Sequence, residues 1–362
     1  MFRCLNRTTG KTIWKNISGR VSRNRRRKAL PGRQPSVCQA VDGLEPSGYL
    51  IETAKEHIAG AIDMKAAQQR IYAYYEARGV RTQQEVETKE ADIVAVRIAA
   101  LLGEKTFQFS PAEWKSIHKR LFCDVFDHAG TFRKYNITKR EWVLNGDTVL
   151  YASFDSLSET LPYDFEQEKQ FSYVGLSVED AVRHIARFTS DLWQIHPFCE
   201  GNTRATAVFI IKYLRTFGFA INNTVFAENS WYFRNALVRA NYNDLKNGIH
   251  ATTKYLERFF EDLLFDAKHD LKNRYLHIEY KSDAQSAANA APKCNDCTLS
   301  CTLDELAVLQ QMKKNPKITQ KTLAEMIGKS ERTVKSITVS LQEKGCVRRI
   351  GGKRSGEWKI IE

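Results

Sequence analysis

The spacing of apolar residues predicts helices along most of the chain after Glu52. Residues 53–79 carry apolar side chains three to five positions apart and end at Gly79, a residue typical of helix C-caps. The inward positions of this stretch are expected to be Ile58, Ile62, Ala66 and Ile71. A second helix is expected over residues 85–102, with the inward positions Ile93, Val96, Ile98 and Leu101. We expect these segments to form an N-terminal helical region, residues 46–105.

Capping residues mark two further helices. Ser110 can cap a helix that opens with Pro111, and Ser177 can cap one that ends before Pro197. The second of these has the apolar positions Ala181, Ile185, Phe188 and Leu192. Because Pro197 disfavours helical geometry at the residue before it, a loop is expected to begin at His196.

Residues 141–153 break the helical pattern. Apolar residues flank Asn145 and Gly146, a pair that tolerates positive φ and favours a tight hairpin turn. The pattern therefore predicts a short β-hairpin. In a helical domain such a hairpin is either a minor cap or a functional flap.

The loop after His196 leads into a segment that is expected to be helical, residues 202–217. Residues 205–211 carry no charge, so this helix is expected to be buried on most sides, with Gly218 as its C-cap. The first N–H groups of a helix have no internal partner, and with the helix dipole they form a site for an anion. A rigid helix is therefore expected to present an anion site to the loop.

The polar side chains of this loop suit a phosphate and a cation. Gly201 lets the backbone approach an oxyanion, Asn202 can donate its amide, and Arg204 can donate two parallel hydrogen bonds. Glu200 would repel an anion unless a cation such as Mg²⁺ bridges the two. A neutral His196 can take a proton from an attacking hydroxyl. In the structural alternative, Glu200 and Arg204 form an ion pair and His196 packs beneath the loop.

The string from His196 to Arg204 resembles the motif HPFx(D/E)GNxR of the Fic family. The likeness extends over about residues 85–265 and includes the sequence GTFR at 130–133. It implies an all-helical Fic core, residues 106–265. In that core, the predicted hairpin would be the flap that aligns a segment of a target protein by strand pairing.

The resemblance implies transfer of AMP from ATP to a Ser, Thr or Tyr hydroxyl of a target protein. His196 would be the general base and Glu200 the Mg²⁺ ligand, so Mg²⁺ and ATP are the expected cofactor and co-substrate. The implied phosphate-binding residues are Gly201, Asn202, Thr203 and Arg204. Tyr232 and Asn235 resemble residues of the helix that lines the base pocket, although core packing explains Tyr232 equally well.

Two positions depart from the family pattern. Thr203 stands where many AMP-transferring members have Gly, and Ala207 stands where they have a second Arg that binds the γ-phosphate. These departures leave two alternatives open. One is transfer of another phosphate-containing group, for example phosphorylation, and the other is a nucleotide-sensing DNA-binding regulator without catalysis.

The last part of the chain predicts a second domain. Residues 266–300 are polar and Ala-rich and are expected to form a linker. The order of helix, helix, helix and hairpin over residues 301–362 resembles a winged helix-turn-helix domain, whose helix 331–343 would enter the major groove of double-stranded DNA. The side chains expected to contact DNA are Arg332, Thr333, Lys335 and Ser336 on that helix and Lys353 and Arg354 on the wing. Protein contacts or dimerisation are the alternative use, so a homodimer stays open.

Basic residues are concentrated at the two ends of the chain. The net charge is +13, residues 1–40 hold 11 Lys/Arg and no Asp/Glu, and residues 301–362 hold 13 basic and 7 acidic residues. Residues 1–45 are expected to be a disordered or artefactual tail, with a transit-like peptide as the alternative. No apolar run reaches the length of about 18 residues that would indicate a membrane span.

The eight cysteines do not form a compact disulfide framework, which favours reduced thiols and a cytoplasmic location. Cys294, Cys297 and Cys301 cluster as CxxCxxxC, but a fourth zinc ligand is not obvious nearby, so solvated thiols are favoured over a metal site. The expected fold class is mainly α: a helical Fic core with a short β-hairpin flap, followed by an α+β winged helix-turn-helix domain.

Overall fold

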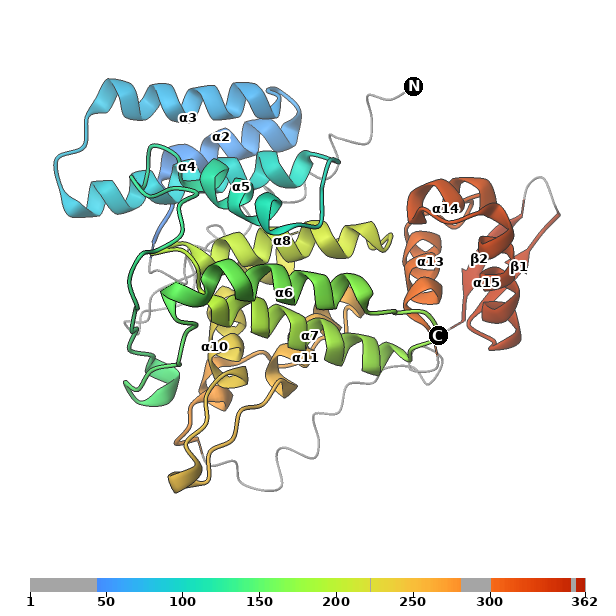
Figure 1. The fold of residues 1–362 in the computed structure, drawn as a ribbon. Helices are drawn as coiled ribbons and strands as arrows, with labels where there is room; N and C mark the ends of the chain where they lie inside the picture. Colours follow the sequence, from blue (N-terminus) through green and yellow to red (C-terminus); the bar gives the residue numbers. More distant parts are fainter. Residues whose placement is uncertain (1–43, 222, 281–300, 353–355, 362) are drawn as a thin grey trace.

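The computed structural model describes residues 44–221, 223–280, 301–352 and 356–361, and this part of the chain is mainly helical (Figure 1). Almost all of the expected basic tail lies outside the described residues, as do residues 281–300 with Cys294 and Cys297. Among the described residues, no helix has the length and apolar character needed to cross a membrane. Their strands form one antiparallel pair near the C-terminus.

The N-terminal helices pack on one another above the rest of the core in Figure 1. They are α2 (Gly48–Ala59), α3 (Met64–Arg78), α4 (Gln83–Gly103) and α5 (Pro111–Phe122). The apolar stretch 53–79 forms parts of two helices, because Gly60 adopts a φ of 82° and Asp63 caps the start of α3. Ser110 accepts a hydrogen bond from the Glu113 N–H and so caps α5 as predicted.

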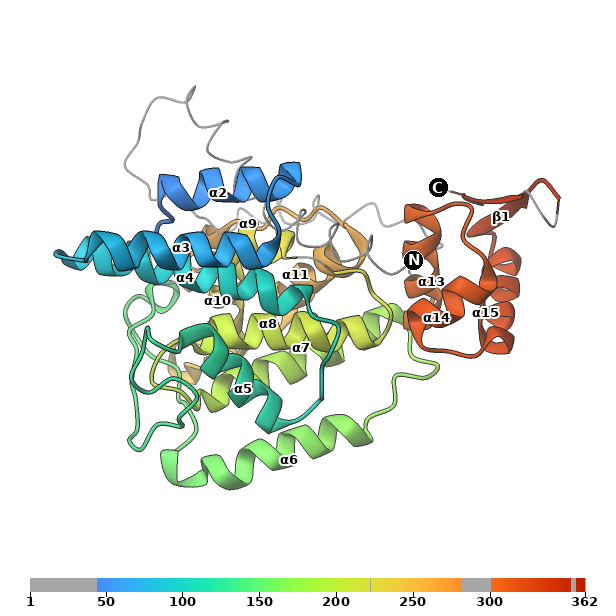
Figure 2. The ribbon, with the colours of Figure 1, turned by 90° about the horizontal axis from the view of Figure 1, so that it is seen from above.

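The larger helices that follow include α8, which lies in the middle of the molecule, between the N-terminal helices and α7 (Figures 1 and 2). They are α6 (Leu157–Gln170), α7 (Val178–Ile195), α8 (Asn202–Thr216), α10 (Ser230–Ala240) and α11 (Lys254–Phe265). Shorter helical turns connect them: η4 (Phe154–Ser156), α9 (Thr224–Glu228) and η5 (Leu245–Asn247). Helix α8 packs against α4, α5 and α7, and its residues from Asn202 to Leu214 are all buried, as the uncharged sequence predicted.

The predicted β-hairpin at residues 141–153 is wrong in its backbone. Asn145 and Gly146 do adopt left-handed conformations, with φ of 56° and 89°. The residues before them form a 3-10 turn, η3 (Trp142–Leu144), instead of a strand. Successive residues Val143 and Leu144 are both buried, so the side chains do not alternate between core and solvent as a half-buried strand requires. A segment without a strand presents no ready strand edge for pairing.

Residues 266–280, expected to begin the linker, pack on the helical core. They contain η6 (Asn273–Leu276), whose Leu276 is buried. The Ile278 N–H donates a hydrogen bond to the Val143 carbonyl at 3.0 Å. This segment therefore covers the side of the 141–153 turn, which its polar composition did not indicate.

The C-terminal helices and strands follow the predicted order. They are α13 (Leu303–Lys314), α14 (Gln320–Ile327), α15 (Glu331–Glu343), β1 (Val347–Ile350) and β2 (Glu357–Ile360). Thr302 and Glu305 form a capping box at the start of α13, and Ser330 caps α15. Val347 pairs with Ile360 at one end of the hairpin.

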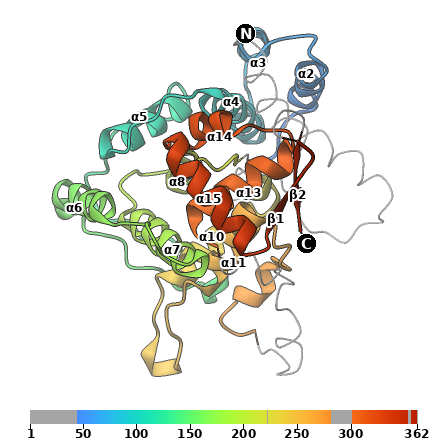
Figure 3. The ribbon, with the colours of Figure 1, turned by 90° about the vertical axis from the view of Figure 1, so that its right-hand side faces the viewer.

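The C-terminal domain contacts the chain just beyond the end of α8. The Gln311 Nε2 donates to the Gly218 carbonyl at 3.0 Å, and the Ala220 N–H donates to the Gln310 Oε1 at 2.8 Å. A Cβ at Gly218 would lie 2.8 Å from the Ile327 side chain, so α14 also fits closely against this turn. Helix α15 lies on the far side of the domain from the core in Figures 1 and 2, and Figure 3 shows it facing the viewer.

Candidate functional site

The loop between α7 and α8 is shaped by two left-handed residues. Helix α7 ends where His196 adopts φ 48° and ψ 55°, as Pro197 led us to expect. Gly201 adopts a φ of 76° and precedes the first residue of α8 without a side-chain cap. The first N–H groups of α8 are therefore left for another acceptor, which is the arrangement that suits an anion. A Cβ at Gly201 would lie 2.4 Å from the Phe122 ring, so the loop requires glycine here.

Arg133 holds the backbone of this loop. Its Nε donates to the His196 carbonyl at 2.8 Å, and its own N–H donates to the Pro197 carbonyl at 2.8 Å. The rest of its guanidinium donates to carbonyls of neighbouring segments, and Arg133 is buried. It belongs to the sequence GTFR, but nothing in that string indicates that its arginine binds backbone instead of substrate.

The His196 imidazole is buried and has a defined tautomer. Its Nδ1 lies 3.2 Å from the Trp193 carbonyl oxygen. Because a carbonyl can only accept, Nδ1 carries the proton in the neutral ring and Nε2 carries the lone pair. Burial lowers the pKa of His196 well below its usual value, and the charges of Lys139 and Arg234 lower it further. The ring is therefore neutral near pH 7 and can accept a proton at Nε2.

A buried ion pair lies behind the His196 ring. The Tyr151 ring centroid is 4.2 Å from that of His196, and the Tyr151 hydroxyl lies 3.4 Å from the Glu141 Oε1. The Arg234 Nη2 donates to both Glu141 oxygens, at 2.6 and 2.8 Å. The sequence marked the segment that carries Glu141 and Tyr151 but gave these side chains no role, because their partner Arg234 lies 93 positions after Glu141 and meets it only on folding.

Glu200 and His118 occupy opposite sides of the loop. The Glu200 side chain is 49% exposed, and its Oε2 lies 2.9 Å from the Lys139 Nζ. The Glu200 carbonyl accepts a hydrogen bond from the His118 Nε2 at 2.9 Å, while the Gly130 N–H donates to His118 Nδ1. Burial lowers the pKa of His118 to about 4, so this ring stays neutral and braces the loop. The Glu200 carboxylate itself faces solvent.

Asn202 and Thr203 are bonded within the protein. The Asn202 Oδ1 accepts from the Phe198 N–H at 3.0 Å, and its Nδ2 donates to the Phe198 carbonyl at 2.7 Å. The Thr203 Oγ1 accepts from the Trp193 Nε1 at 2.9 Å. The Asn202 amide therefore clamps the loop, and one of its two amide hydrogens is already used. The sequence predicted it as a phosphate ligand.

Arg204 points toward α4. Its Nη1 lies 2.8 Å from the Glu90 Oε1, in an ion pair without the alignment of a hydrogen bond. Its guanidinium carbon lies 4.6 Å from the Phe122 ring centroid. Both contacts are internal, and Arg204 is buried. The structural alternative of a Glu200–Arg204 pair does not describe this arrangement, because Glu200 pairs with Lys139 and Arg204 with Glu90.

The remaining predicted residues lie elsewhere. Tyr232 is buried, and the Asn235 Nδ2 donates to the Asn273 Oδ1 at 2.8 Å, so both take part in packing on α10. The four residues predicted on α15 are exposed, in agreement with a surface role: Arg332, Thr333, Lys335 and Ser336. Lys353 and Arg354 lie outside the described residues.

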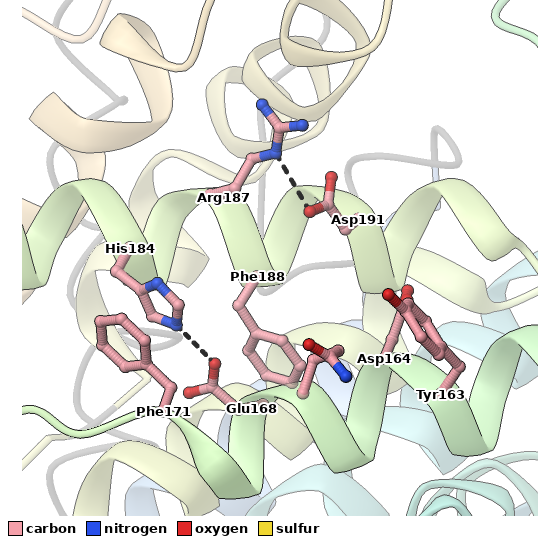
Figure 4. Close-up of a pocket in the computed structure, with 9 residues that line it drawn as sticks. Tyr163, Asp164, Glu168, Phe171, His184, Arg187, Phe188 and Asp191 are labelled. Atoms are coloured by element: carbon pink, nitrogen blue, oxygen red, sulfur yellow. Dashed lines mark hydrogen bonds and ion pairs between the residues drawn. The ribbon is translucent and has the colours of Figure 1, made fainter.

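A separate cavity of about 290 Å³ lies between α6 and α7 (Figure 4). At its wall, Glu168 accepts hydrogen bonds from the Tyr173 and Tyr213 hydroxyls, and its Oε2 lies 2.7 Å from the His184 Nε2. Burial raises the pKa of Asp164, on the same wall, to about 6. None of the predicted site residues lines this cavity.

The residues of the loop fit a magnesium ion bound mainly by phosphate. Glu200 supplies one half-exposed carboxylate, and Mg²⁺ is commonly held by one or two carboxylates together with substrate phosphates. Among the described residues, no group of three or more His, Cys, Asp or Glu side chains forms a metal cage. A single carboxylate, that of Glu200, thus suits a magnesium ion that binds together with a nucleotide better than an ion held by the protein alone.

Residues 108–214 match the Fic/DOC family, and residues 305–348 match the winged helix-turn-helix DNA-binding family. The chain is 27% identical over 150 residues to the protein adenylyltransferase VbhT of Bartonella schoenbuchensis, a match that covers 41% of this chain and 30% of that protein. It is 25% identical over 154 residues to a probable protein adenylyltransferase Fic of Escherichia coli, covering 42% of this chain and 72% of the relative.

A solved structure also resembles part of the chain. It is the N-terminal Fic domain of a cell filamentation protein from Bartonella quintana, with bound ADP, at 20% identity and a TM-score of 0.42. The superposition covers 51% of this chain and 87% of that one. The first curated relative is much longer than its matched part, since the match spans less than a third of VbhT.

Proposed function

Because residues 108–214 of this chain form a Fic/DOC-family domain, we propose that the protein transfers AMP from ATP to a Ser, Thr or Tyr hydroxyl of a target protein. One observation carries the proposal: the buried His196 ring is held neutral, with its lone pair on Nε2, at the start of the loop that leads to α8. The curated relatives are named for the same activity.

In the proposed reaction, the target hydroxyl oxygen attacks the α-phosphorus of ATP and gives its proton to the His196 Nε2. The bond from the α-phosphorus to the bridging oxygen of the β-phosphate breaks, and pyrophosphate leaves. The uncapped N–H groups at the start of α8 would bind the phosphate oxygens, and Arg133 would hold the His196 backbone in place. When bound at Glu200, Mg²⁺ would neutralise charge on the leaving pyrophosphate.

The side chains of Asn202 and Arg204 contribute indirectly in this proposal. Both already bond inside the protein, to Phe198 and to Glu90. We therefore expect the backbone of residues 201–203 to make the main phosphate contacts. The target protein would dock near residues 141–153, where Trp142 and Leu150 expose apolar side chains.

Labelled ATP separates the proposed reaction from its alternatives. The protein is incubated with Mg²⁺ and candidate targets, using ATP labelled either at the α- or at the γ-phosphate. We expect α-label on protein and a loss of at least about a hundredfold in His196→Ala, the usual scale for removing a general base. Transfer of γ-label would instead indicate a kinase, and transfer of neither label would remove ATP as the donor.

A second function is proposed for the C-terminal domain, because residues 305–348 match a DNA-binding family. The outward face of α15 carries exposed Arg332 and Lys335, which supports contact with double-stranded DNA. Exposed charge alone does not distinguish DNA from an acidic protein partner. Binding to duplex DNA itself, measured against salt concentration, makes that distinction.

A further inference from the structure

The cationic side chains around His196 differ in what they already bind. Arg133 donates to backbone carbonyls, and Arg234 pairs with both oxygens of the buried Glu141. Arg204, at the start of α8, pairs with Glu90. Moving any of these guanidinium groups to a ligand would leave a buried carbonyl or carboxylate without its partner, which is costly.

Lys139 is different because its partner is a surface carboxylate. Its Nζ lies 2.9 Å from the Glu200 Oε2, and the two side chains are 23% and 49% exposed. Ion pairs of this kind contribute only about 0–1 kcal/mol, so this contact is easily exchanged for another. The positive charge of Lys139 also lowers the pKa of the proposed base, His196.

We propose that Lys139 is a ligand of the donor's phosphate oxygens, and that its ammonium moves from Glu200 to phosphate when the donor binds. This inference rests on the proposed function for the identity of the donor, and on the geometry for the identity of the ligand. In the form without nucleotide, the ammonium neutralises Glu200 and keeps that carboxylate beside the start of α8. In the complex, Glu200 is available to a divalent cation while Lys139 adds positive charge to the anion site.

The exchange solves an electrostatic problem of the loop. A carboxylate next to an anion site repels the anion, and the neighbouring arginines are engaged elsewhere. Lysine suits a contact that must change partners, because its ammonium is a compact charge on a flexible stem. Lys139, just before the 141–153 segment, therefore supplies a cation that can change partners. No motif in the sequence predicted this role.

The first experiment measures binding to the full chain in metal-free buffer containing EDTA. The probes are ATP, inorganic tripolyphosphate and adenosine, and the variants are Lys139→Ala and Lys139→Arg. Arg140→Ala is the matched control, since it removes an exposed charge from the next position. We expect Lys139→Ala to weaken ATP and tripolyphosphate on the order of tenfold, the scale of one charge-assisted hydrogen bond. Adenosine binding should not change, and Lys139→Arg should retain most of the affinity.

A second variant tests the exchange itself. Glu200→Gln should strengthen ATP binding in metal-free buffer, because it removes the repulsive carboxylate and releases Lys139. If the ammonium is shared between Glu200 and phosphate, the gain should be smaller when Glu200→Gln is combined with Lys139→Ala. Equal gains in both backgrounds would mean that the two side chains act independently, against the exchange.

The three probes keep this inference separate from the proposed function. If Lys139→Ala binds ATP as the wild type does, or loses adenosine as much as ATP, Lys139 is not a phosphate ligand although the transferase proposal stands. If the wild type binds neither phosphate compound, or binds them equally well without Lys139, the ligand assignment is wrong. The transferase proposal is decided separately, by the transfer of α-label in the presence of Mg²⁺.

Discussion

Gly201 is a position at which adding a single methyl group should lower the stability of the fold strongly. Its φ of 76° is strained for any other residue, and a Cβ there would lie 2.4 Å from the Phe122 ring. Gly175 has a similar φ of 80°, but nothing lies within 4 Å of its would-be Cβ. The two glycines therefore share the backbone strain and differ in the steric contact.

We expect Gly175→Ala to lower the free energy of unfolding by about 1–2 kcal/mol, the penalty of the left-handed conformation. Gly201→Ala should exceed it by roughly another 2 kcal/mol, because the ring of Phe122 must move in a packed core. Urea denaturation of the two variants measures the difference. Equal losses of unfolding free energy in the two variants would show that the Phe122 ring moves aside at no measurable cost.

The pH dependence of the transfer reaction follows from the buried state of His196. Its pKa is lowered well below the usual value, mainly by burial and then by Lys139 and Arg234. The base is therefore still neutral as the pH falls through about 6.5, the ordinary histidine pKa. We expect kcat/KM for α-label transfer to stay level through that pH and to decline only at a lower one.

The same group makes folding pH-dependent. The unfolded chain takes up a proton on His196 near pH 6.5, whereas the folded chain does so only at lower pH. The contribution of His196 to stability is therefore complete above the unfolded pKa and is lost as the pH falls below it.

For the transfer reaction, an acid limb of kcat/KM centred at or above pH 6.5 would contradict the role of this imidazole as the base.

Residue identity predicted some site features better than others. The loop start at His196 followed from Pro197. Gly201 was expected to let the backbone approach an oxyanion, whereas its φ of 76° and the nearby Phe122 ring are what require glycine in the structure. The direction of the Arg204 side chain could not be predicted, because its partner Glu90 lies on another helix. A short polar motif predicts which residues belong to a site, but not which of their side chains bond inside the protein instead of to a ligand.

At the scale of elements, the link between α4 and α8 is an ion pair with very little access to solvent. The Arg204 side chain is 2% exposed and that of Glu90 is 15% exposed. Removing one partner of such a pair leaves the other charge in a poorly solvated place. Glu87 lies one turn earlier on α4 and is exposed, which makes it a matched control.

We expect Glu90→Ala to lower the free energy of unfolding by about 3 kcal/mol, whereas Glu87→Ala should change it by less than about 0.5 kcal/mol. Chemical denaturation of both variants checks this. If the two substitutions cost the same, the Glu90 contact does not contribute to holding α8 in place.

Helix boundaries were predictable where a capping side chain sets them. Ser110 and Ser177, the two caps predicted from the sequence, each accept a backbone N–H at the start of their helix. The hairpin prediction was wrong because Asn145 and Gly146 specify a tight turn but do not specify strands on either side of it. The flanking residues pack on η6, a segment more than 120 positions later, and that tertiary contact decided their backbone.

At the scale of the whole molecule, the exposed face of α15 predicts binding to DNA that depends on salt. With the full chain and duplex DNA, the logarithm of the binding constant should fall linearly with the logarithm of salt concentration. Lys335→Ala should reduce that slope by about 0.9 if Lys335 contacts one phosphate. Lys65→Ala, an exposed position on α3, is the control for charge alone. A salt-independent interaction, or an equal effect of both variants, would contradict DNA contact through α15.

Helix α8 begins at the His196 loop and ends at the turn that carries the C-terminal domain. Its 15 residues, of which those from Asn202 to Leu214 are buried, make a stiff rod about 22 Å long, because an α-helix rises about 1.5 Å per residue. A tilt of that rod cannot be confined to one end. If a ligand at the loop shifts α8 and thereby changes the affinity of the distant domain for its own partner, that partner must alter the loop's affinity by the same factor.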